Sequence, residues 1–113
     1  MASTGYLIMI RIKGGNLKFE IMKEATIQTL HPGSRKRNKR ISVEKYEIIK
    51  AAILEILQYL TPTHSELMEE LAAKLKNNFQ DNVNWYGTTV KLDLEARKIL
   101  VRTSSKPQRY RVK

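Results

Sequence analysis

The C-terminal third of the chain constrains the fold most, because its hydrophobic spacing changes from a helical to a strand period within a few residues. Between residues 83 and 94, apolar side chains recur at steps of three and four residues, which predicts one face of a helix. Asp81 or Asn82 is expected to cap the start of that helix. Residues 99–101 and 108–112 then suit two short strands joined by a small polar loop. This third of the chain is therefore predicted to be a helix followed by a two-stranded ribbon.

Two further helices are predicted upstream. Ser42 is expected to cap a helix that runs to about Leu60 and whose broad apolar face marks it as the central helix of the core. Thr63 and Glu66 have the spacing of a capping box, and the helix that they begin is expected to end near Asn77. The residues expected to face one shared core are Val43, Tyr46, Ile49, Ile53, Ile56, Leu57, Leu67, Leu71, Ala72, Leu75, Val90, Leu94 and Ile99.

The N-terminal segment has a different pattern. Residues 6–13 and 17–23 are apolar or alternating around a Gly-Gly-Asn sequence, which is typical of a β-hairpin. A phosphate-binding loop fits the glycine pair poorly, because no Gly-Lys-Ser/Thr follows it. Alternatively, the biological chain begins at Met22 and the residues before it are an extension. Residues 1–26 are therefore treated as an N-terminal hairpin or extension, and residues 27–113 as the main domain.

Length and composition narrow the class of protein. A chain of 113 residues is one domain, and it is long enough to bury a core without metal or disulfide cross-links. The absence of cysteine excludes disulfides and thiolate zinc sites, and no metal or cofactor is expected. No signal peptide is expected, and Glu55 and Gln58 interrupt the best apolar run for a membrane span. The predicted location is the cytoplasm, without a membrane partner.

Charge is distributed unevenly along the chain. Lys and Arg number 21 against 11 Asp and Glu, a net charge of +10. Five of the six residues 35–40 are basic, and residues 97–113 contain seven basic side chains and no acid, whereas residues 51–96 are acidic overall. Segregation of this kind predicts a polyanionic partner, because a chain that needs only solubility mixes its signs. Nucleic acid is favoured over a membrane surface, since no basic amphipathic helix accompanies the charge.

Several stretches carry a resemblance to known proteins. They are His31-Pro32-Gly33, Val43-Glu44-Lys45-Tyr46, Trp85-Tyr86, the run Thr89-Val90-Lys91-Leu92-Asp93-Leu94-Glu95-Ala96, and the end from Pro107 to Arg109. Through them, residues 27–113 resemble the winged helix-turn-helix superfamily, and more narrowly a family of small uncharacterised bacterial proteins. The resemblance implies an α+β fold with three helices, a C-terminal β-ribbon wing and a possible N-terminal β-hairpin. Lys98 stands where winged-helix regulators usually have glycine.

Duplex DNA is the predicted partner, for a transcriptional regulator or a DNA-associated accessory factor. In winged helices the third helix enters the major groove and the ribbon lies along the backbone or minor groove. The ribbon is expected to contribute most, because Arg109 and Arg111 are two residues apart and share a strand face. Asp93 and Glu95 in the third helix are expected to repel phosphate. The residues expected to contact DNA are Arg35, Lys36, Arg37, Lys39, Arg40, Asn84, Thr88, Lys91, Arg102, Lys106, Arg109 and Arg111.

Other interpretations stay open. The basic run at 35–40 is equally consistent with a solvated loop or with an arm that contacts phosphate. Trp85 and Leu92 belong either to the core or to a contact surface, and a protein-interaction module, such as a homodimer, is the alternative function. An enzyme is not expected, because His31 and His64 lie in separate loops or caps and no acid–base pair is evident.

Overall fold

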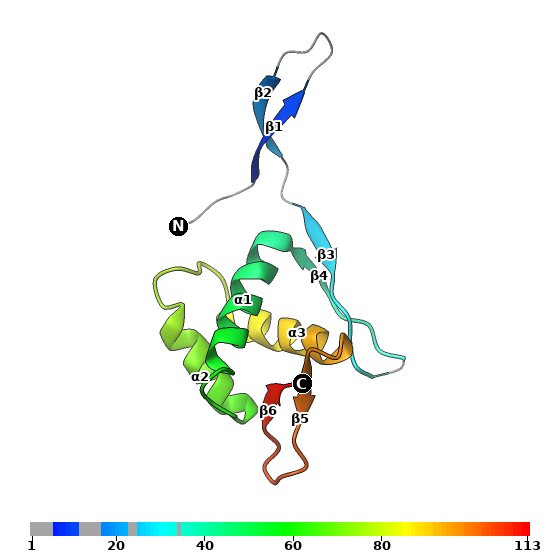
Figure 1. Cartoon of the computed structure of the whole chain (residues 1–113), viewed down its shortest axis with the longest axis vertical. Coiled ribbons are helices and arrows are strands. Elements are labelled where there is room, and N and C mark those ends of the chain that lie inside the picture. The colour runs from blue at the N-terminus through cyan, green and yellow to red at the C-terminus, as the bar shows by residue number, and fades with distance from the viewer. Residues whose placement is uncertain (1–5, 12–16, 23–24, 34) are drawn as a thin grey trace.

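The computed structural model describes residues 6–11, 17–22, 25–33 and 35–113. Within these residues the fold is α+β, with three helices and three separate two-stranded antiparallel sheets (Figure 1). The elements in chain order are β1 (Tyr6–Arg11), β2 (Leu17–Met22), β3 (Thr26–Gln28), β4 (Arg40–Ser42), α1 (Val43–Ile56), α2 (His64–Lys74), α3 (Val83–Ala96), β5 (Leu100–Arg102) and β6 (Tyr110–Val112).

The helix starts follow the predicted caps. Ser42 Oγ accepts a hydrogen bond from the Lys45 amide, and Asn82 Oδ1 accepts one from the Trp85 amide. Both bonds of the predicted capping box before α2 are also present. The helix ends come earlier than predicted, because residues 57–59 and 75–78 form tighter turns after α1 and α2. Local capping therefore fixes where the helices start, whereas the turns that follow α1 and α2 determine where those two helices end.

The three helices pack around one apolar core, as predicted. Of the expected members, Val43 and Ile99 are only partly buried, and Ala72 is exposed, so its inward placement was wrong. The strands contribute buried residues that the helical periodicity did not include: Ile41, Leu100 and Tyr110. Gly87 allows α2 and α3 to approach closely, since a Cβ there would lie 2.9 Å from both Leu71 Cδ1 and Met68 Sδ.

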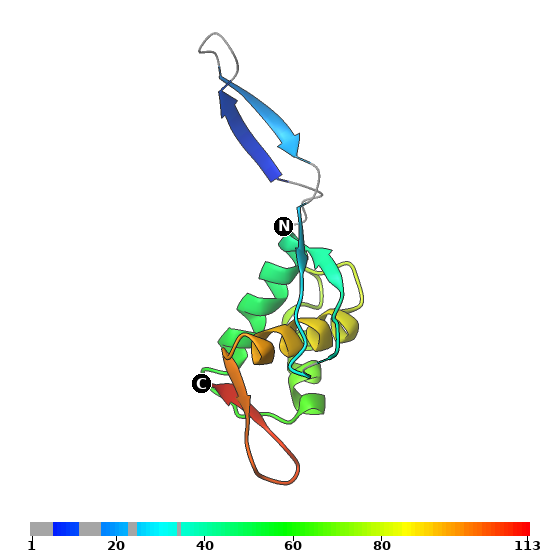
Figure 2. The same ribbon diagram turned by 90° about the vertical axis from the view of Figure 1, so that its right-hand side faces the viewer.

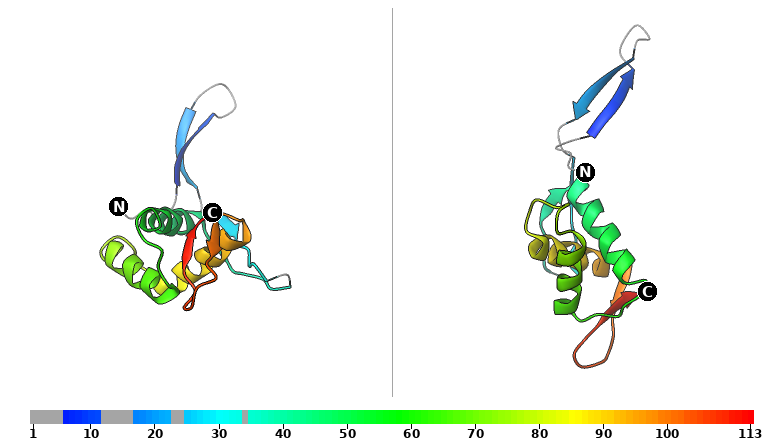
Figure 3. Two further views of the ribbon diagram at one scale, coloured as in Figure 1. Left: turned by 60° about the horizontal axis from the view of Figure 1, so that its bottom comes forward. Right: turned by 90° about the vertical axis from the view of Figure 1, so that its left-hand side faces the viewer.

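The predicted C-terminal ribbon is present and forms the wing, residues 100–112. Leu100 pairs with Val112 and Arg102 with Tyr110 in an antiparallel register. The amide of Tyr110 also donates to the Pro62 carbonyl at 2.9 Å, which ties the wing to the connection between α1 and α2. Three helices followed by this wing make a winged-helix-like arrangement, and Figure 3 shows the wing projecting beyond the helices.

The predicted N-terminal hairpin is also present. Strands β1 and β2 pair in antiparallel register from Tyr6 opposite Met22 to Arg11 opposite Leu17. Its expected Gly-Gly-Asn turn lies outside the described residues. Figure 2 shows the hairpin standing away from the helices, on the side opposite to the wing. No helix in the part of the chain that the structure describes is both long enough and apolar enough to cross a membrane.

A second hairpin, which the sequence analysis did not predict, precedes α1. Strands β3 and β4 pair from Thr26 opposite Ser42 to Gln28 opposite Arg40. We call residues 26–42 the arm. Its connecting segment carries most of the basic run and projects from the helical body (Figure 1). Strand β3 begins at Thr26, and the domain boundary between residues 26 and 27 stays a prediction.

Lys98 forms the corner between α3 and the wing. Its φ is +65°, in the left-handed region that glycine favours. The Lys98 amide donates to the Glu95 carbonyl at 3.1 Å and the Ile99 amide to the Leu94 carbonyl at 2.9 Å. These are the two bonds of a Schellman motif, so the corner has the shape that glycine usually supplies.

We expect Lys98→Gly to raise the free energy of unfolding by about 1 kcal/mol, because a left-handed non-glycine residue is strained by roughly that amount. Urea denaturation measures the change. Lys98→Ala is the control, since it removes the same charged side chain but keeps the Cβ that causes the strain. Equal stability of the glycine and alanine variants would contradict the prediction.

Candidate functional site

The Asn38 side chain forms the first attachment of the arm to α3, through one hydrogen bond to α3 and a second one within the arm. Asn38 Nδ2 donates to the carbonyls of Leu30 and Thr89, each at 2.9 Å. Gln28 Nε2 donates to the Asn38 carbonyl at 2.7 Å, and the Thr29 amide to the Lys39 carbonyl at 3.1 Å. The base of the basic segment is therefore hydrogen-bonded to β3 and to α3, whereas Arg35, Lys36 and Arg37 are exposed.

Asp93 provides the second attachment. Its side chain is fully buried and accepts hydrogen bonds from the Tyr46 hydroxyl at 2.5 Å and from the Leu30 amide at 2.7 Å. The Arg97 guanidinium, one turn later in the chain, donates to both carboxylate oxygens at 2.8 and 3.0 Å. One carboxylate thus joins α1, α3 and the arm. The sequence analysis expected Asp93 at the surface, where it would repel phosphate, but its side chain is buried.

This pairing affects the titration of both partners. Burial, followed by the hydrogen bond to Asp93, raises the pKa of the Tyr46 hydroxyl above its ordinary value of 10.0. The hydrogen bond to Asp93 likewise raises the pKa of Arg97. The tyrosine therefore stays a neutral donor and the arginine a cation, which is the combination that a buried carboxylate needs.

We expect Asp93→Asn to lower the free energy of unfolding by about 3–5 kcal/mol, because it removes the charge that the surrounding donors stabilise. Tyr46→Phe should cost less, about 1–2 kcal/mol, since it removes one of the donors and leaves the ion pair with Arg97. Urea denaturation measures both effects, and faster tryptic cleavage in the arm of Asp93→Asn would report its release. A stability loss in Asp93→Asn no larger than in Tyr46→Phe would contradict the central role of the carboxylate.

The arm presents its cations to solvent. All five predicted basic residues are exposed, and among the described residues none of them has a carboxylate within 4.0 Å. Arg40 donates only to the Thr26 hydroxyl, at 3.0 Å. The five residues are Arg35, Lys36, Arg37, Lys39 and Arg40. Their charge is therefore available to an anionic partner.

The wing presents less free charge than the sequence suggested. Arg102 Nε lies 2.5 Å from Glu95 Oε1, and Arg109 Nη1 lies 3.0 Å from Glu66 Oε1. Lys106 and Arg111 are exposed and have no carboxylate within 4.0 Å among the described residues. The arm, not the wing, consequently has the denser concentration of uncompensated charge.

The helical wheel predicted that Lys91 lies on the outer face of α3, but the structure places it in a buried position. Its side chain is 5% exposed, and its ammonium nitrogen lies 4.0 Å from the centre of the Tyr110 ring and 3.7 Å from Glu95 Oε2. Glu95 is also buried. The prediction failed because the wing covers this side of the helix, which a single inward stripe does not take into account. Lys91 is therefore removed from the candidate contact residues.

His64 belongs to the same buried cluster at the base of the wing. Its Nδ1 is buried and has no hydrogen-bond partner among the residues that the structure describes. Burial, followed by the charges of Lys91 and Arg102, lowers the pKa of His64 below its ordinary value of 6.5. The histidine is thus neutral at physiological pH and adds no charge to the surface. No group of three His, Asp or Glu residues in the described part of the chain could hold a metal ion.

The arm and the wing contact opposite sides of α3. The arm contacts Thr89 and Asp93, whereas the wing contacts Lys91 and Glu95. In a helix, residues two apart point about 160° away from each other. The two basic hairpins therefore bracket the remaining stripe of α3, which we call the outer stripe. It consists of Asn84, Trp85, Thr88 and Leu92.

The outer stripe carries no charge. Asn84 and Trp85 are exposed, and Thr88 and Leu92 are half-buried. Trp85 packs edge-on against Tyr86 with ring centres 4.8 Å apart, so it is partly packed and partly a surface residue. The Thr88 hydroxyl donates to Met68 Sδ at 3.9 Å. Of the predicted third-helix contacts, Asn84 is thus the most accessible polar group.

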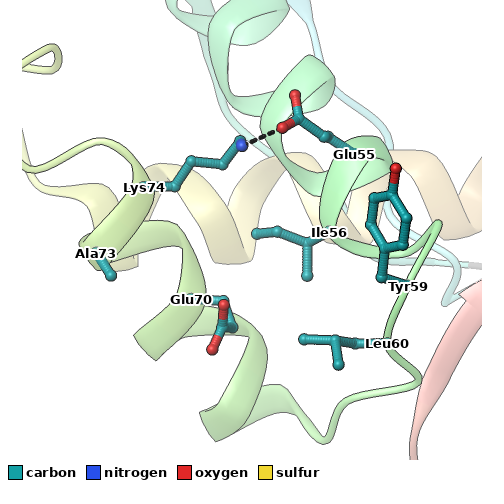
Figure 4. A pocket seen from close by; sticks show the side chains of 7 residues that line it. All are labelled: Glu55, Ile56, Tyr59, Leu60, Glu70, Ala73 and Lys74. Carbon is teal, nitrogen blue, oxygen red and sulfur yellow. Dashed lines mark hydrogen bonds and ion pairs between the residues drawn. The ribbon is translucent and has the colours of Figure 1, made fainter.

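Two surface hollows accompany these elements. The first, of about 680 Å³, lies between the arm and the C-terminal end of α3. The second, of about 490 Å³, lies between the end of α1 and α2, where Ile56, Leu60 and Ala73 form its apolar part (Figure 4). Glu55 and Lys74 form an ion pair at its edge. The first hollow is next to basic residues, whereas the second combines apolar and acidic groups.

Sequence analysis missed the residues that position the arm. Asn38 was the single uncharged residue within a run of five cations, and that interruption is a signal that could have marked it as a hydrogen-bonding position. Asp93 was interpreted as a surface acid, although Arg97 stands four residues later on the same helix face. Thr29, which is fully buried and also donates to the Lys39 carbonyl through its hydroxyl, had no recognisable signal.

Comparison with known proteins places the chain in a family without assigning a function. Residues 26–110 match the family described as "Family of unknown function (DUF6958)". The chain belongs to this family. The matched segment begins at the first residue of β3 and ends at the first residue of β6, so it contains the arm, the three helices and most of the wing. No curated protein and no solved structure matches the chain.

Proposed function

We propose that this DUF6958 protein is a cytoplasmic, non-enzymatic member of the winged helix-turn-helix superfamily that binds duplex DNA. The observation that carries the proposal is the arm, which holds five exposed cations without a carboxylate partner among the described residues. Neutralising phosphate charge with Lys and Arg releases condensed counterions and supplies most of non-specific DNA affinity. A transcriptional regulator or a DNA-associated accessory factor would use such binding.

The placement of the two hairpins supports a duplex as the partner. The arm and the wing lie on opposite sides of α3, and the wing is at the end of the molecule away from β1 and β2 (Figures 1 and 2). Phosphates on both edges of a groove would then meet Arg and Lys side chains, while the outer stripe of α3 faces the groove between them. Asn84 at the start of that stripe has the donor and acceptor that base edges require.

We expect Lys36→Gln combined with Lys39→Gln to lower the salt dependence of duplex binding. Each phosphate contact contributes about 0.9 to the slope of log affinity against log salt, so the slope should fall by up to about 1.8. Fluorescence anisotropy with a random-sequence duplex at several salt concentrations measures it. The matched control is Lys74→Gln combined with Lys76→Gln, which changes the same residue types in and after α2 and should leave the slope nearly unchanged.

Two outcomes would contradict the proposal. Absence of duplex binding by the unaltered protein at low salt would exclude DNA as the partner. Equal slopes in the arm and control variants, with both folded by circular dichroism, would mean that binding reflects only total charge. Arg111→Gln added to the arm variant should lower the slope further, whereas Arg109 is already paired with Glu66 and should contribute less.

The alternative function is a protein-interaction module, and one observation favours it. At the hollow between α1 and α2, the side chains of Tyr59 and Leu60 are 81% and 44% exposed (Figure 4). Glu70 lines the same hollow and has no cation within 4.0 Å among the described residues. The partner that fits these groups is a second copy, because the basic arm of one molecule complements the acidic α1–α2 surface of another.

This alternative predicts a dimer at low salt that dissociates as salt screens the complementary charges. Tyr59→Ser combined with Leu60→Ser should convert the dimer to a monomer by removing the apolar contact. Size-exclusion chromatography with light scattering gives the mass directly. Val112→Ser is the control, because it replaces an exposed apolar residue outside the hollow. A monomer mass for the unaltered protein at all salt concentrations would remove the alternative.

A further inference from the structure

The His31-Pro32-Gly33 turn is not used by the duplex proposal, yet it forms one wall of the hollow beside the arm. That hollow, of about 680 Å³, is lined by Gln28, Thr29, Leu30, His31, Gly33, Lys36, Arg37, Asn38 and Ala96. No carboxylate is among the lining residues, whereas two of them are cationic. The size is within the range of small-molecule sites. The turn and the basic run are therefore parts of one concave surface.

The turn fixes the tautomer of His31. The Gly33 amide donates to His31 Nδ1 at 2.8 Å, so Nδ1 is the acceptor and the ring proton of the neutral imidazole is on Nε2. His31 thus offers its Nε2–H as a hydrogen-bond donor. Such a donor is suited to binding an anion.

Gly33 also determines how closely the side chains on either side approach. A Cβ on Gly33 would lie 3.1 Å from His31 Nδ1 and 3.1 Å from Lys36 Cδ. Both distances are shorter than ordinary van der Waals contacts, so a larger residue would push the imidazole and the lysine stem apart. Glycine at this position therefore lets His31 and Lys36 close around the same part of the hollow.

The other polar groups of the hollow are already used within the protein. Gln28 Nε2 donates to the Thr29 and Asn38 carbonyls, and Asn38 Nδ2 donates to the Leu30 and Thr89 carbonyls. Among the lining side chains, the donors left for a ligand are the His31 imidazole and the charged ends of Lys36 and Arg37. An imidazole N–H, an ammonium and a guanidinium together match the several acceptor oxygens of phosphate.

We propose that this hollow is a binding site for a single phosphate group, held by His31, Lys36 and Arg37. The phosphate comes either from the backbone of a duplex or from a free nucleotide. The first source rests on the proposed function, whereas the second goes beyond it. The volume exceeds that of phosphate alone and leaves room for the attached sugar.

Chemical-shift titration of the full-length, isotopically labelled protein tests the site. The probes are inorganic phosphate, deoxythymidine 5′-monophosphate and, as the uncharged control, deoxythymidine. The Gly33 amide and the His31 ring should shift saturably with the first two probes and not with deoxythymidine. His31→Phe and Lys36→Gln should each weaken nucleotide binding roughly tenfold, the usual loss when a hydrogen bond to a charged group is removed.

Two further variants separate a built site from general charge attraction. Gly33→Ala changes no charge, and it should weaken binding because it separates His31 from Lys36. Lys76→Gln removes an exposed cation outside the hollow and should leave binding unchanged. Circular dichroism confirms the fold of each variant. Equal weakening by Lys76→Gln and Lys36→Gln would overturn the proposal, as would the absence of saturable shifts at Gly33 and His31.

The outcomes also separate this site from duplex binding. If the arm variant changes the salt slope for duplex DNA while phosphate and nucleotide leave Gly33 and His31 unaffected, the phosphate site is overturned and the proposed function stands. If the nucleotide binds with the expected variant pattern but no duplex binds at low salt, the site stands and the proposed function fails. Loss of duplex affinity in His31→Phe, alongside loss of nucleotide binding, identifies the backbone phosphate as a ligand of the same hollow.

Discussion

The rest of the site depends on the buried carboxylate of Asp93. A carboxylate removed from water loses several kcal/mol of solvation unless donors replace the solvent, and removing a single partner of a buried pair is strongly destabilising. Here the donors come from α1, from the arm and from the helix of Asp93 itself. The native fold therefore has to keep all three in place together. The need to satisfy this one charge, together with the Asn38–Thr89 hydrogen bond, holds the arm against α3.

Ion pairing also decides where the positive charge of this protein is available. Residues 97–113 contain more cations than the arm, but Arg97, Arg102 and Arg109 are each engaged by a carboxylate. The field near the wing is reduced accordingly, since a paired cation and its carboxylate largely cancel at a distance. In the arm no such cancellation occurs among the described residues. A count of charges along the sequence therefore ranks the two basic segments in the opposite order to the folded surface.

The parts of the fold that the sequence predicted are those fixed by neighbours in the chain. Ser42, Asn82 and the Thr63–Glu66 capping box act over three residues, and the core stripes of α1 and α2 follow from helical spacing. The arm could not be predicted in this way, because its contacts with α3 join residues 51 and 63 positions apart. Charge repulsion within the basic run argues against a paired strand at its end, where β4 begins. The hydrogen bonds between the arm and α3 oppose this repulsion.

The placement of α3 residues failed for a related reason. A helical wheel assumes one buried side, but α3 is covered by α1 and α2, by the arm and by the wing. Each element that packs on α3 buries residues that helical periodicity assigns to the surface. The wing buries Lys91 and Glu95 in this way. At Lys98 the backbone conformation, not the burial, differs from what the residue type favours. Lysine has a low intrinsic preference for the left-handed region, but the hydrogen bonds at the end of α3 hold it there.

Burial of every charged side chain of α3 has a consequence for recognition. Lys91, Asp93 and Glu95 are all buried, so the outer stripe offers only neutral groups to a partner. In the proposed duplex complex, long-range attraction would come from the two hairpins, because charge attraction acts on any phosphate backbone regardless of sequence. Discrimination between sequences would then be left to short-range contacts of the stripe, such as those of the Asn84 amide and the Trp85 ring. If the protein binds duplex DNA as proposed, affinity and sequence preference depend on different elements: replacing an arm cation should alter affinity without altering preference, whereas replacing Asn84 should do the reverse.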